Sequence, residues 1–489
     1  MTKRDKIAVI IGAGPAGLAT AYSLLTETDN VKPIIYEASD VVGGIARTVF
    51  FGKNGVDIGG HRLFSKSQKI VDLWNSFLPD EVENNLNPDE VDIVMMRKKR
   101  FSEILYLRKL FAYPISMTVQ TFKNMGLKRT ILAGFSYLKS TIFKVEEKNL
   151  EDFMVNRFGR VLYEMFFESY TEKVWGRHPR NISKEWGEQR IKGLSLVKAV
   201  LNALKLTKKK ETSLIDEFSY PKYGCTQLWN LMTEKIVEMG GQIEFNTEVI
   251  GLNTENNEVK SVKIRNNSGE FDVRADYVMS SMPIKDLVLG MNDVPDDVKN
   301  VAKTLPYRDY MLVGLYLKDM NLKENGKISK DSWIYIQEPD VKVGRMQIMN
   351  NWSKYLVQDD KNVLISLEYF ADEGDEYWNM ADDKFIEFAI CEGEKIGILK
   401  KEDVLDAIRL RVKKAYPAYF DSYSEFNTIQ KYLDKFENLY CIGRNGQHRY
   451  NNLDHSMLTG IEAVKIIKGD SDKKALWSIN AEQEYHETK

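Results

Sequence analysis

Ile7-Ala8-Val9-Ile10-Ile11-Gly12-Ala13-Gly14-Pro15-Ala16-Gly17 is the stretch that decides the fold of this chain of 489 residues. The run 7–11 has the apolar character of a strand buried on both faces, and residues 18–25 (LATAYSLL) indicate a helix. The glycines between them follow the G-x-G-x-x-G spacing. The first permits a tight turn, the second lets the backbone approach a pyrophosphate, and the third packs helix against strand. The stretch therefore predicts a dinucleotide-binding turn with these residues at the ligand: Gly12, Gly14, Pro15, Ala16 and Gly17.

A carboxylate at the end of the next strand supports this prediction. The run Pro33 to Tyr36 indicates a second strand that leads into Glu37, which stands 25 residues after Gly12. An acidic residue at this place in a βαβ unit accepts hydrogen bonds from ribose hydroxyls. We therefore expect Glu37 to bind the ribose of the ligand.

Two further glycine pairs extend the predicted binding site. Gly43-Gly44 lets the backbone reach the phosphates a second time, and Arg47 supplies a fixed guanidinium charge to the pyrophosphate. Gly59-Gly60 leaves room for a flat ring beside the backbone. The segment from Glu37 to Arg47 resembles the extension shared by amine-oxidase-like flavoproteins, which implies FAD rather than NAD as the cofactor.

Composition argues against several classes of function. A net charge of −2 gives no global attraction to nucleic acid or anionic membrane. The three cysteines, Cys225, Cys391 and Cys441, are far apart, so they predict no disulfide framework and no metal site, as in a reducing compartment. No apolar stretch approaches the roughly 20 residues of a membrane span. These features predict a cytoplasmic enzyme without a transmembrane segment, a bound metal or a nucleic-acid partner.

The order of the predicted elements indicates an α/β fold with a discontinuous first domain. We expect a Rossmann-like FAD-binding domain of the GR2 type, built from residues 1–95, 215–300 and 436–470. A helical, cation-rich domain at 97–210 is inserted, and a mixed antiparallel sheet at 301–435 forms the substrate domain. The returning segments supply further expected cofactor contacts: Val249, Gly443, Arg444, Asn452, Leu453 and Ser456.

Four motifs resemble the longer, eukaryote-type UDP-galactopyranose mutases, which belong to the amine oxidase and protoporphyrinogen oxidase-like FAD superfamily. They are spread over most of the chain, with large gaps between them. The motifs are Gly59-Gly60-His61-Arg62-Leu63-Phe64-Ser65; SYTEKVW at 169–175 followed by WGEQR at 186–190; Trp333-Ile334-Tyr335 with Arg345 and Asn351-Trp352-Ser353; and Ala415-Tyr416-Pro417 with GRNGQHRYNNLDHS at 443–456.

The resemblance implies roles for the matching residues. His61 would contact the flavin edge and respond to its redox state. Trp175 would stack on the base, while Arg190 and Arg345 would bind the diphosphate as it leaves. His61, Arg190 and Arg345 are thus the catalytic candidates. The same resemblance adds four substrate contacts: Tyr335, Tyr416, Tyr450 and Asn452.

Two departures leave the base and the sugar open. Thr171 stands where the family has asparagine, so a hydrogen bond to uracil is lost. Tyr450 lies two residues closer to the N-x-D-H-S stretch than in the family pattern. Galactose and uridine are the family's defaults, and another hexose, a modified sugar or a thymidine nucleotide stays open.

The family's chemistry implies an isomerase. In those mutases N5 of the reduced flavin attacks the anomeric carbon while the nucleoside diphosphate leaves, and the sugar recloses through a different hydroxyl without net oxidation. The resemblance therefore implies interconversion of the pyranose and furanose forms of a UDP-galactose-like sugar. NAD(P)H is a candidate reductant of the FAD. It would have to enter the substrate cleft, because the chain has no second dinucleotide fingerprint.

Other interpretations stay open. One is an FAD oxidoreductase of the protoporphyrinogen oxidase, desaturase or amine oxidase type acting on an apolar or lipid-linked substrate. Between Arg97 and Lys144 there are 11 Lys or Arg and a single acid, Glu103. Such a block could contact a membrane peripherally, attract a diphosphate or simply solvate helices. A non-catalytic nucleotide-binding protein is a third interpretation, and the sequence predicts no oligomeric state.

Overall fold

The dinucleotide turn lies in a parallel sheet assembled from distant parts of the chain. The computed structural model describes residues 5–115, 118–184 and 217–480. Five parallel strands pair in the order β21-β13-β1-β2-β9. Their bounds are Lys6–Ile11 (β1), Val31–Tyr36 (β2), Gln242–Glu244 (β9), Tyr277–Ser280 (β13) and Leu439–Cys441 (β21). Strands of this kind are buried on both faces, which explains the apolar run at the start of the chain.

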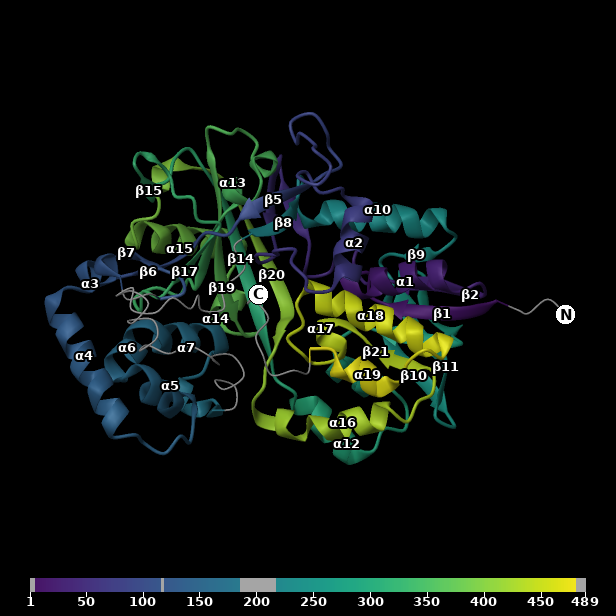
Figure 1. Ribbon diagram of the computed structural model, residues 1–489. Helices are drawn as coiled ribbons and strands as arrows, with labels where there is room; N and C mark the ends of the chain where they lie inside the picture. Colours follow the sequence, from purple (N-terminus) through teal and green to yellow (C-terminus); the bar gives the residue numbers. More distant parts are fainter. Residues whose placement is uncertain (1–4, 116–117, 185–216, 481–489) are drawn as a thin grey trace.

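Helices cover one face of this sheet, and a small second sheet lies nearby (Figure 1). The covering helices are α1 (Pro15–Glu27), α2 (Gln68–Phe77), α10 (Cys225–Glu238), α18 (Leu453–Lys468) and α19 (Lys473–Ser478). A separate antiparallel sheet comprises β10 (Glu248–Glu255), β11 (Glu258–Asn266) and β12 (Gly269–Arg274). It shares a core with α11 (Ile284–Leu289), α12 (Asp296–Thr304) and α16 (Phe426–Leu433). Residues 426–433, expected in the substrate domain, therefore pack with the FAD-binding part.

A seven-stranded mixed sheet forms the second half of the molecule, in the order β20-β14-β19-β18-β17-β6-β7. All its neighbours are antiparallel except β17 and β6. The bounds are Ser102–Tyr106 (β6), Lys109–Ala112 (β7), Tyr307–Leu317 (β14), Trp333–Ile336 (β17), Arg345–Ile348 (β18), Val363–Ala371 (β19) and Val404–Pro417 (β20). Residues 102–112, expected in the helical domain, instead extend this sheet, because their backbone pairs with residues 333–336.

Short ladders and helices complete the two halves of the molecule. Two-stranded ladders pair β3 (Thr48–Phe51) with β4 (Asn54–Asp57), β5 (Met95–Lys99) with β8 (Glu217–Pro221) and β15 (Lys323–Glu324) with β16 (Lys327–Ile328). Helices α13 (Met349–Trp352), α14 (Glu376–Asn379) and α15 (Asp382–Lys395) flank the large sheet, and α17 (Gly443–Gly446) follows β21. Asp57 ends β4 fully buried, where it accepts hydrogen bonds from Thr48 and Tyr220 at 2.6 and 2.7 Å.

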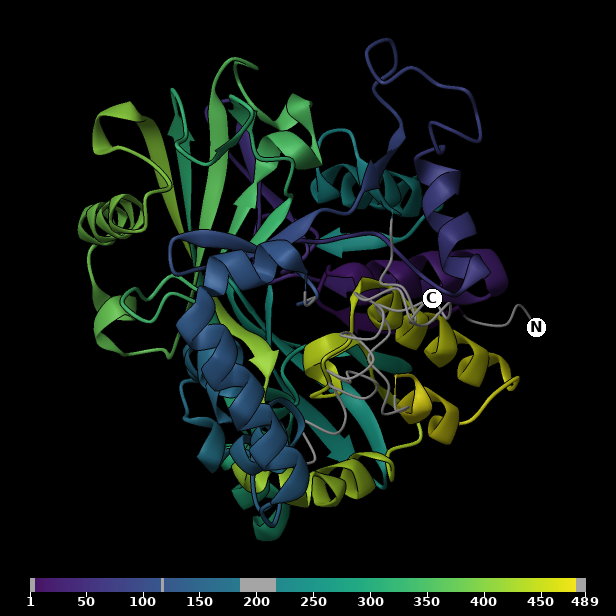
Figure 2. The same ribbon diagram turned by 60° about the vertical axis from the view of Figure 1, so that its left-hand side comes forward.

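The inserted block is helical, as predicted, from residue 119 onward (Figure 2). It contains α3 (Val119–Met125), α4 (Leu127–Ile142), α5 (Leu150–Phe158), α6 (Arg160–Tyr163) and α7 (Ser169–Trp175), with a π-helical turn at Glu164–Glu168 before α7. The predicted continuation to residue 210 lies outside the described residues. Within the described part of the chain, no helix has the length and apolar character needed to cross a membrane.

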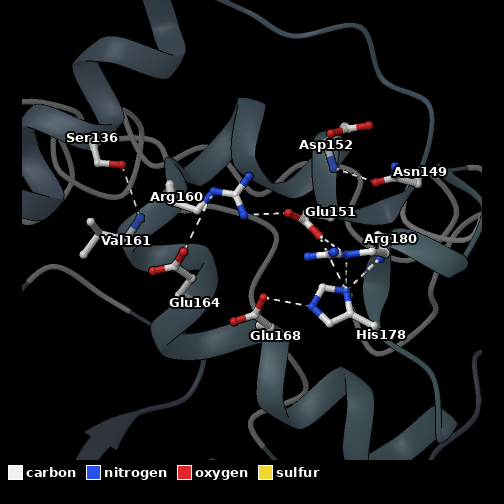
Figure 3. A network of polar contacts seen from close by, with 10 residues as sticks. All are labelled: Ser136, Asn149, Glu151, Asp152, Arg160, Val161, Glu164, Glu168, His178 and Arg180. Carbon is white, nitrogen blue, oxygen red and sulfur yellow. Dashed lines mark hydrogen bonds and ion pairs between the residues drawn. The ribbon is translucent and has the colours of Figure 1, made fainter.

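A buried carboxylate connects the helices of this block (Figure 3). Glu151, at the start of α5, is 7% exposed and pairs with Arg160 at 2.5 Å and with Arg180 at 3.4 Å. His178 lies 3.5 Å from Glu151 and 3.1 Å from Glu168. The two arginines already balance the carboxylates, so the cluster joins α5 to α6, to the π-helical turn and to the segment at 178–180 through ion pairs.

We expect Glu151→Ala to lower the free energy of unfolding by about 1–3 kcal/mol, because it leaves guanidinium groups without their buried partner. Thermal and urea unfolding would measure this loss. Glu164→Ala is the matched control, since Glu164 is half-exposed and lies 3.9 Å from Arg160. It should change stability by less than ~0.5 kcal/mol. Equal losses in the two variants would contradict the role of Glu151.

Candidate flavin and substrate site

The glycines of the first turn are required for two different reasons. Gly12 has φ +97°, and a Cβ there would lie 2.4 Å from Ser281 Oγ. A Cβ on Gly17 would lie 2.0 Å from the carbonyl oxygen of Gly12. A Cβ on Gly14 would meet nothing closer than Gly44 Cα at 3.9 Å. The protein itself therefore excludes side chains at Gly12 and Gly17, whereas the space beside Gly14 is open.

Glu37 and the Gly43-Gly44 pair are connected to this turn by hydrogen bonds. The Glu37 carboxylate accepts hydrogen bonds from the amide of Ala13 at 2.8 Å and from the amide and hydroxyl of Ser39 at 2.9 and 2.7 Å. The amide of Gly43 donates to the carbonyl of Ala13 at 2.9 Å. Arg47 reaches the carbonyl of Gly44 at 3.2 Å. The predicted ribose and phosphate residues thus form one connected loop system.

Two helix N-termini lie in this region without side-chain caps. α1 begins at Pro15, and the amides of Ala16 and Gly17, both buried, have no cap from a side chain. α18 begins at Leu453 after Asn452, again without a side-chain cap. Buried helix ends require hydrogen-bond acceptors, and an anionic or carbonyl-bearing ligand supplies them.

The last glycine-rich loop brings α18 to α1. A Cβ on Gly460 of α18 would lie 2.6 Å from the carbonyl oxygen of Ala16, so the two helices touch backbone to backbone. Ser65, the last residue of the GGHRLFS loop, donates to Asp454 at 2.9 Å. Gly443 has φ +74°, and Ser456 is buried in the first turn of α18. The predicted contacts at residues 443–456 therefore converge with the turn at Gly12, whereas Val249 is buried in β10 within a core cluster.

His61 lies between the two halves of the molecule, and its hydrogen bonds define its tautomer. Its Nε2 lies 2.8 Å from the carbonyl of Ile58 and 3.0 Å from that of Ile45. Carbonyl oxygens only accept, so Nε2 carries the proton and Nδ1 keeps a lone pair. Burial, assisted by the charges of Arg444 and Arg345, lowers the pKa of His61 to about 4. His61 is therefore a neutral imidazole at physiological pH.

Arg345 is a fixed, buried cation. It begins β18 opposite Glu368 of β19, and its Nε donates to the fully buried Glu368 carboxylate at 2.5 Å. Its Nη2 donates to the hydroxyl of Tyr416 at 2.7 Å. Glu368 also accepts from Gln347 at 2.7 Å. The guanidinium is thus held at two ends while it keeps further N–H groups.

Aromatic rings surround Arg345 and supply donors. The guanidinium carbon lies 5.0 Å from the Trp333 ring centre and 4.7 Å from that of Phe370. Trp333 Nε1 and the hydroxyl of Tyr310 are buried and have no hydrogen-bond partner among the described residues. Tyr416 uses its oxygen to accept from Arg345, which leaves its own proton to donate. All these groups can donate, so the site favours a ligand with several acceptor oxygens.

The Gly59-Gly60 pair borders the donors around Arg345 directly. A Cβ on Gly60 would lie 2.5 Å from the Trp333 ring, so backbone and indole are in contact. A Cβ on Gly59 would lie 3.9 Å from the hydroxyl of Tyr310. The Gly59-Gly60 pair therefore lies between the parallel sheet and the cation of the mixed sheet.

Comparison with known proteins identifies the family. A model of the flavin containing amine oxidoreductase family matches residues 15–417. The chain belongs to this family. This flavoprotein accordingly binds FAD. The uncapped helix ends and the open space at Gly14 fit its phosphate groups.

Solved structures share the fold of this flavoprotein over nearly its whole length. The structure of a reduced UDP-galactopyranose mutase superposes with a TM-score of 0.81 at 22% identity, covering 98% of this chain and 99% of the other. A putative protoporphyrinogen oxidase from Exiguobacterium sp. 255-15 gives 0.68 at 15% identity, covering 94% and 99%. A putrescine oxidase gives 0.60 at 14% identity, covering 95% and 99%.

Not every predicted substrate residue of the flavoprotein joins the donor cluster. Tyr450 stacks on Tyr416 with ring centres 5.7 Å apart, and Arg444 lies 4.6 Å from the Tyr450 ring. Tyr335 stacks on Trp333 at 6.0 Å. Trp175 is 6% exposed and packs edge-on against Phe420, so its stacking role stays a prediction.

Arg190, the third catalytic candidate, lies outside the described residues. The sequence prediction missed Glu368 and Tyr310, which hold and surround the cation. A single acid within the apolar run 363–371 was the available signal for Glu368, since such a charge is buried only when paired.

The pKa of His61 has a consequence for stability. A free imidazole has a pKa of ~6.5. Between pH ~6.5 and ~4, His61 is therefore protonated in the unfolded chain but neutral in the folded flavoprotein. The free energy of unfolding should therefore fall by about 1–3 kcal/mol over that range. His61→Gln, which keeps a donor for the two carbonyls, should flatten this part of the curve. An imidazole ¹⁵N titration midpoint for His61 near ~6.5 would contradict the burial effect.

Proposed function

We propose that this flavoprotein is a nucleotide-sugar mutase that interconverts the pyranose and furanose forms of a UDP-galactose-like sugar. The observation that carries the proposal is the set of uncommitted donors around Arg345. A diphosphate presents several acceptor oxygens and negative charge, which matches Tyr416, Tyr310 and Trp333 around a fixed guanidinium. The fold shared with a reduced UDP-galactopyranose mutase supports it.

The protein residues would act by charge stabilisation and positioning. Bound in its reduced form, FAD would supply the nucleophilic centre for exchange at the anomeric carbon. Arg345 would stabilise the charge of the departing diphosphate without moving, because Glu368 and Tyr416 already fix its orientation. Tyr416 would donate its hydroxyl proton to a phosphate oxygen. Arg444, beside Tyr450, would supply a second positive charge.

His61 would act beside the cofactor. Its Nε2–H is committed to the carbonyls of Ile45 and Ile58, so only Nδ1 can respond to the ligand. A neutral imidazole with a free lone pair can accept a hydrogen bond, and protonation there would give a cation. We infer that His61 senses the charge of the neighbouring ring through Nδ1.

The test is a titration of anaerobically reduced protein with UDP, dTDP and UDP-galactose, followed by product analysis. We expect binding of a nucleoside diphosphate and formation of a furanose product without consumption of an electron acceptor. Failure to bind any nucleoside diphosphate, with the flavin intact, would refute the mutase and its Arg345 assignment together.

The alternative is an FAD oxidoreductase acting on an apolar or lipid-linked substrate. The putative protoporphyrinogen oxidase with this fold supports it. Such an enzyme would consume one equivalent of oxidant for each product. Peroxide release on aerobic turnover, without a furanose product, would favour this alternative. A simple amine substrate suits the site less, because Arg345 and Arg444 make it cationic.

A further inference from the structure

Helix α4 places its large apolar side chains on the outside. Ala133 and Ser140 are buried on its inner face. Ser136 accepts a hydrogen bond from the amide of Val161 at 3.2 Å (Figure 3). A Cβ on Gly159 would lie 2.7 Å from the amide nitrogen of Tyr137, so the helix packs backbone against backbone. Small residues thus attach α4 to the protein, the reverse of an ordinary surface helix.

The outer face of α4 is a continuous apolar stripe. Leu127, Ile131, Phe135, Leu138 and Ile142 recur every three or four residues and are 78%, 47%, 69%, 57% and 70% exposed. Among the described residues, ten of the eighteen exposed large apolar side chains lie between Val119 and Val145. In Figure 1 α3 and α4 form the outer edge of the helical block, and in Figure 2 α4 lies in front of its other helices. An exposed patch of this kind indicates an interaction surface.

The charged side chains of α3 and α4 are all positive. Residues 104–145 contain seven Lys or Arg and no Asp or Glu. Lys128 and Lys139 lie along one side of the apolar stripe, and both are exposed. Basic side chains that flank an exposed apolar stripe are the pattern of helices that lie in the surface of an anionic bilayer.

We propose that α3 and α4 form a docking surface for an anionic membrane. The stripe would enter the boundary between headgroups and acyl chains, while Lys128 and Lys139 meet lipid phosphates. A second copy of the chain fits less well. Symmetric pairing through this face would bring the same lysines together with no acid on α3 or α4 to balance them. The surface lies on the helical block and shares no residue with the candidate flavin site.

The experiment is vesicle co-sedimentation of the full-length protein with phosphatidylcholine alone and with added phosphatidylglycerol. We expect binding to the anionic vesicles at least ~10-fold tighter than to the neutral ones, decreasing as salt screens the phosphates. The triple variant Ile131→Ser, Phe135→Ser, Leu138→Ser should weaken this binding at least ~10-fold. Lys128→Glu with Lys139→Glu should remove the preference for anionic lipid.

A matched triple variant controls for the loss of exposed apolar surface. Val237, Phe271 and Leu405 are 54%, 45% and 44% exposed on other elements, and their change to serine should leave vesicle binding within ~2-fold. Failure of the natural protein to bind anionic vesicles would overturn the proposal. So would equal binding by the two triple variants. A concentration-dependent dimer that only the α4 variant dissociates, without vesicle binding, would instead assign the face to a second copy.

Discussion

Replacing Arg345 with lysine is expected to lower turnover of the nucleotide sugar by roughly 100-fold. The guanidinium reaches the Glu368 carboxylate and the Tyr416 hydroxyl at once, at 2.5 and 2.7 Å, and still offers N–H groups to a ligand. A lysine ammonium keeps the charge that Glu368 needs but cannot span the same positions. The loss should appear in kcat more than in FAD content, because Arg345 lies on the mixed sheet, outside the phosphate loops.

Arg409→Lys is the matched control. Arg409 is buried in β20 and donates to the carbonyls of Tyr377 and Met380, away from the donor cluster. Its replacement should reduce thermal stability while leaving kcat per bound flavin within ~2-fold. Unchanged turnover in Arg345→Lys, with Arg409→Lys equally active, would refute the role of Arg345 in stabilising the leaving group.

Gly14→Ala is expected to weaken FAD binding by roughly 100-fold without destabilising the FAD-free protein. Gly14 has φ −76° and ψ 179°, an ordinary extended conformation that alanine adopts. The added methyl would also meet no protein atom within 3.9 Å. The space it fills is where we expect the pyrophosphate to approach the uncapped end of α1. The flavin-to-protein ratio and the dissociation constant would measure the loss.

Gly17→Ala separates cofactor loss from misfolding. Its Cβ would lie 2.0 Å from the carbonyl oxygen of Gly12, so this variant should unfold at a lower temperature even without FAD. If Gly14→Ala instead retained full FAD affinity, the pyrophosphate would have to bind elsewhere. Equal destabilisation of both FAD-free variants would show that Gly14 serves the protein's own packing.

The fold of the FAD-binding part was predictable because its sequence motifs are local. The turn from Gly12 to Gly17 and the carboxylate at Glu37 stand at spacings that a βαβ unit requires, and the structure joins them through the amide of Ala13. The return of residues 439–441 to the same sheet was also expected, since a strand followed by a glycine-rich loop and a helix suits its edge. Such patterns depend on short stretches of chain.

The substrate half depended on strand register, which the sequence does not display. Arg345 could be singled out by its motif, but its pairing with Glu368 arises from the alignment of β18 with β19. Residues 102–112 were wrongly expected in the helical domain, because their basic residues conceal two short strands that pair only with distant partners. The exposure of the apolar stripe of α4 could likewise not be predicted, since periodicity alone does not tell which face of a helix is covered.

The discontinuous parallel sheet has a consequence for biosynthesis. Its edge strand β21 comes from residues 439–441, and the helix that we expect to complete the cofactor site follows at 453–468. A ribosome must therefore release almost the entire polypeptide before the first turn, made hundreds of residues earlier, finds its last partners. A nascent chain truncated before residue 439 cannot capture the cofactor in this way. We therefore expect holoenzyme formation to follow translation, with flavin supply acting on completed chains.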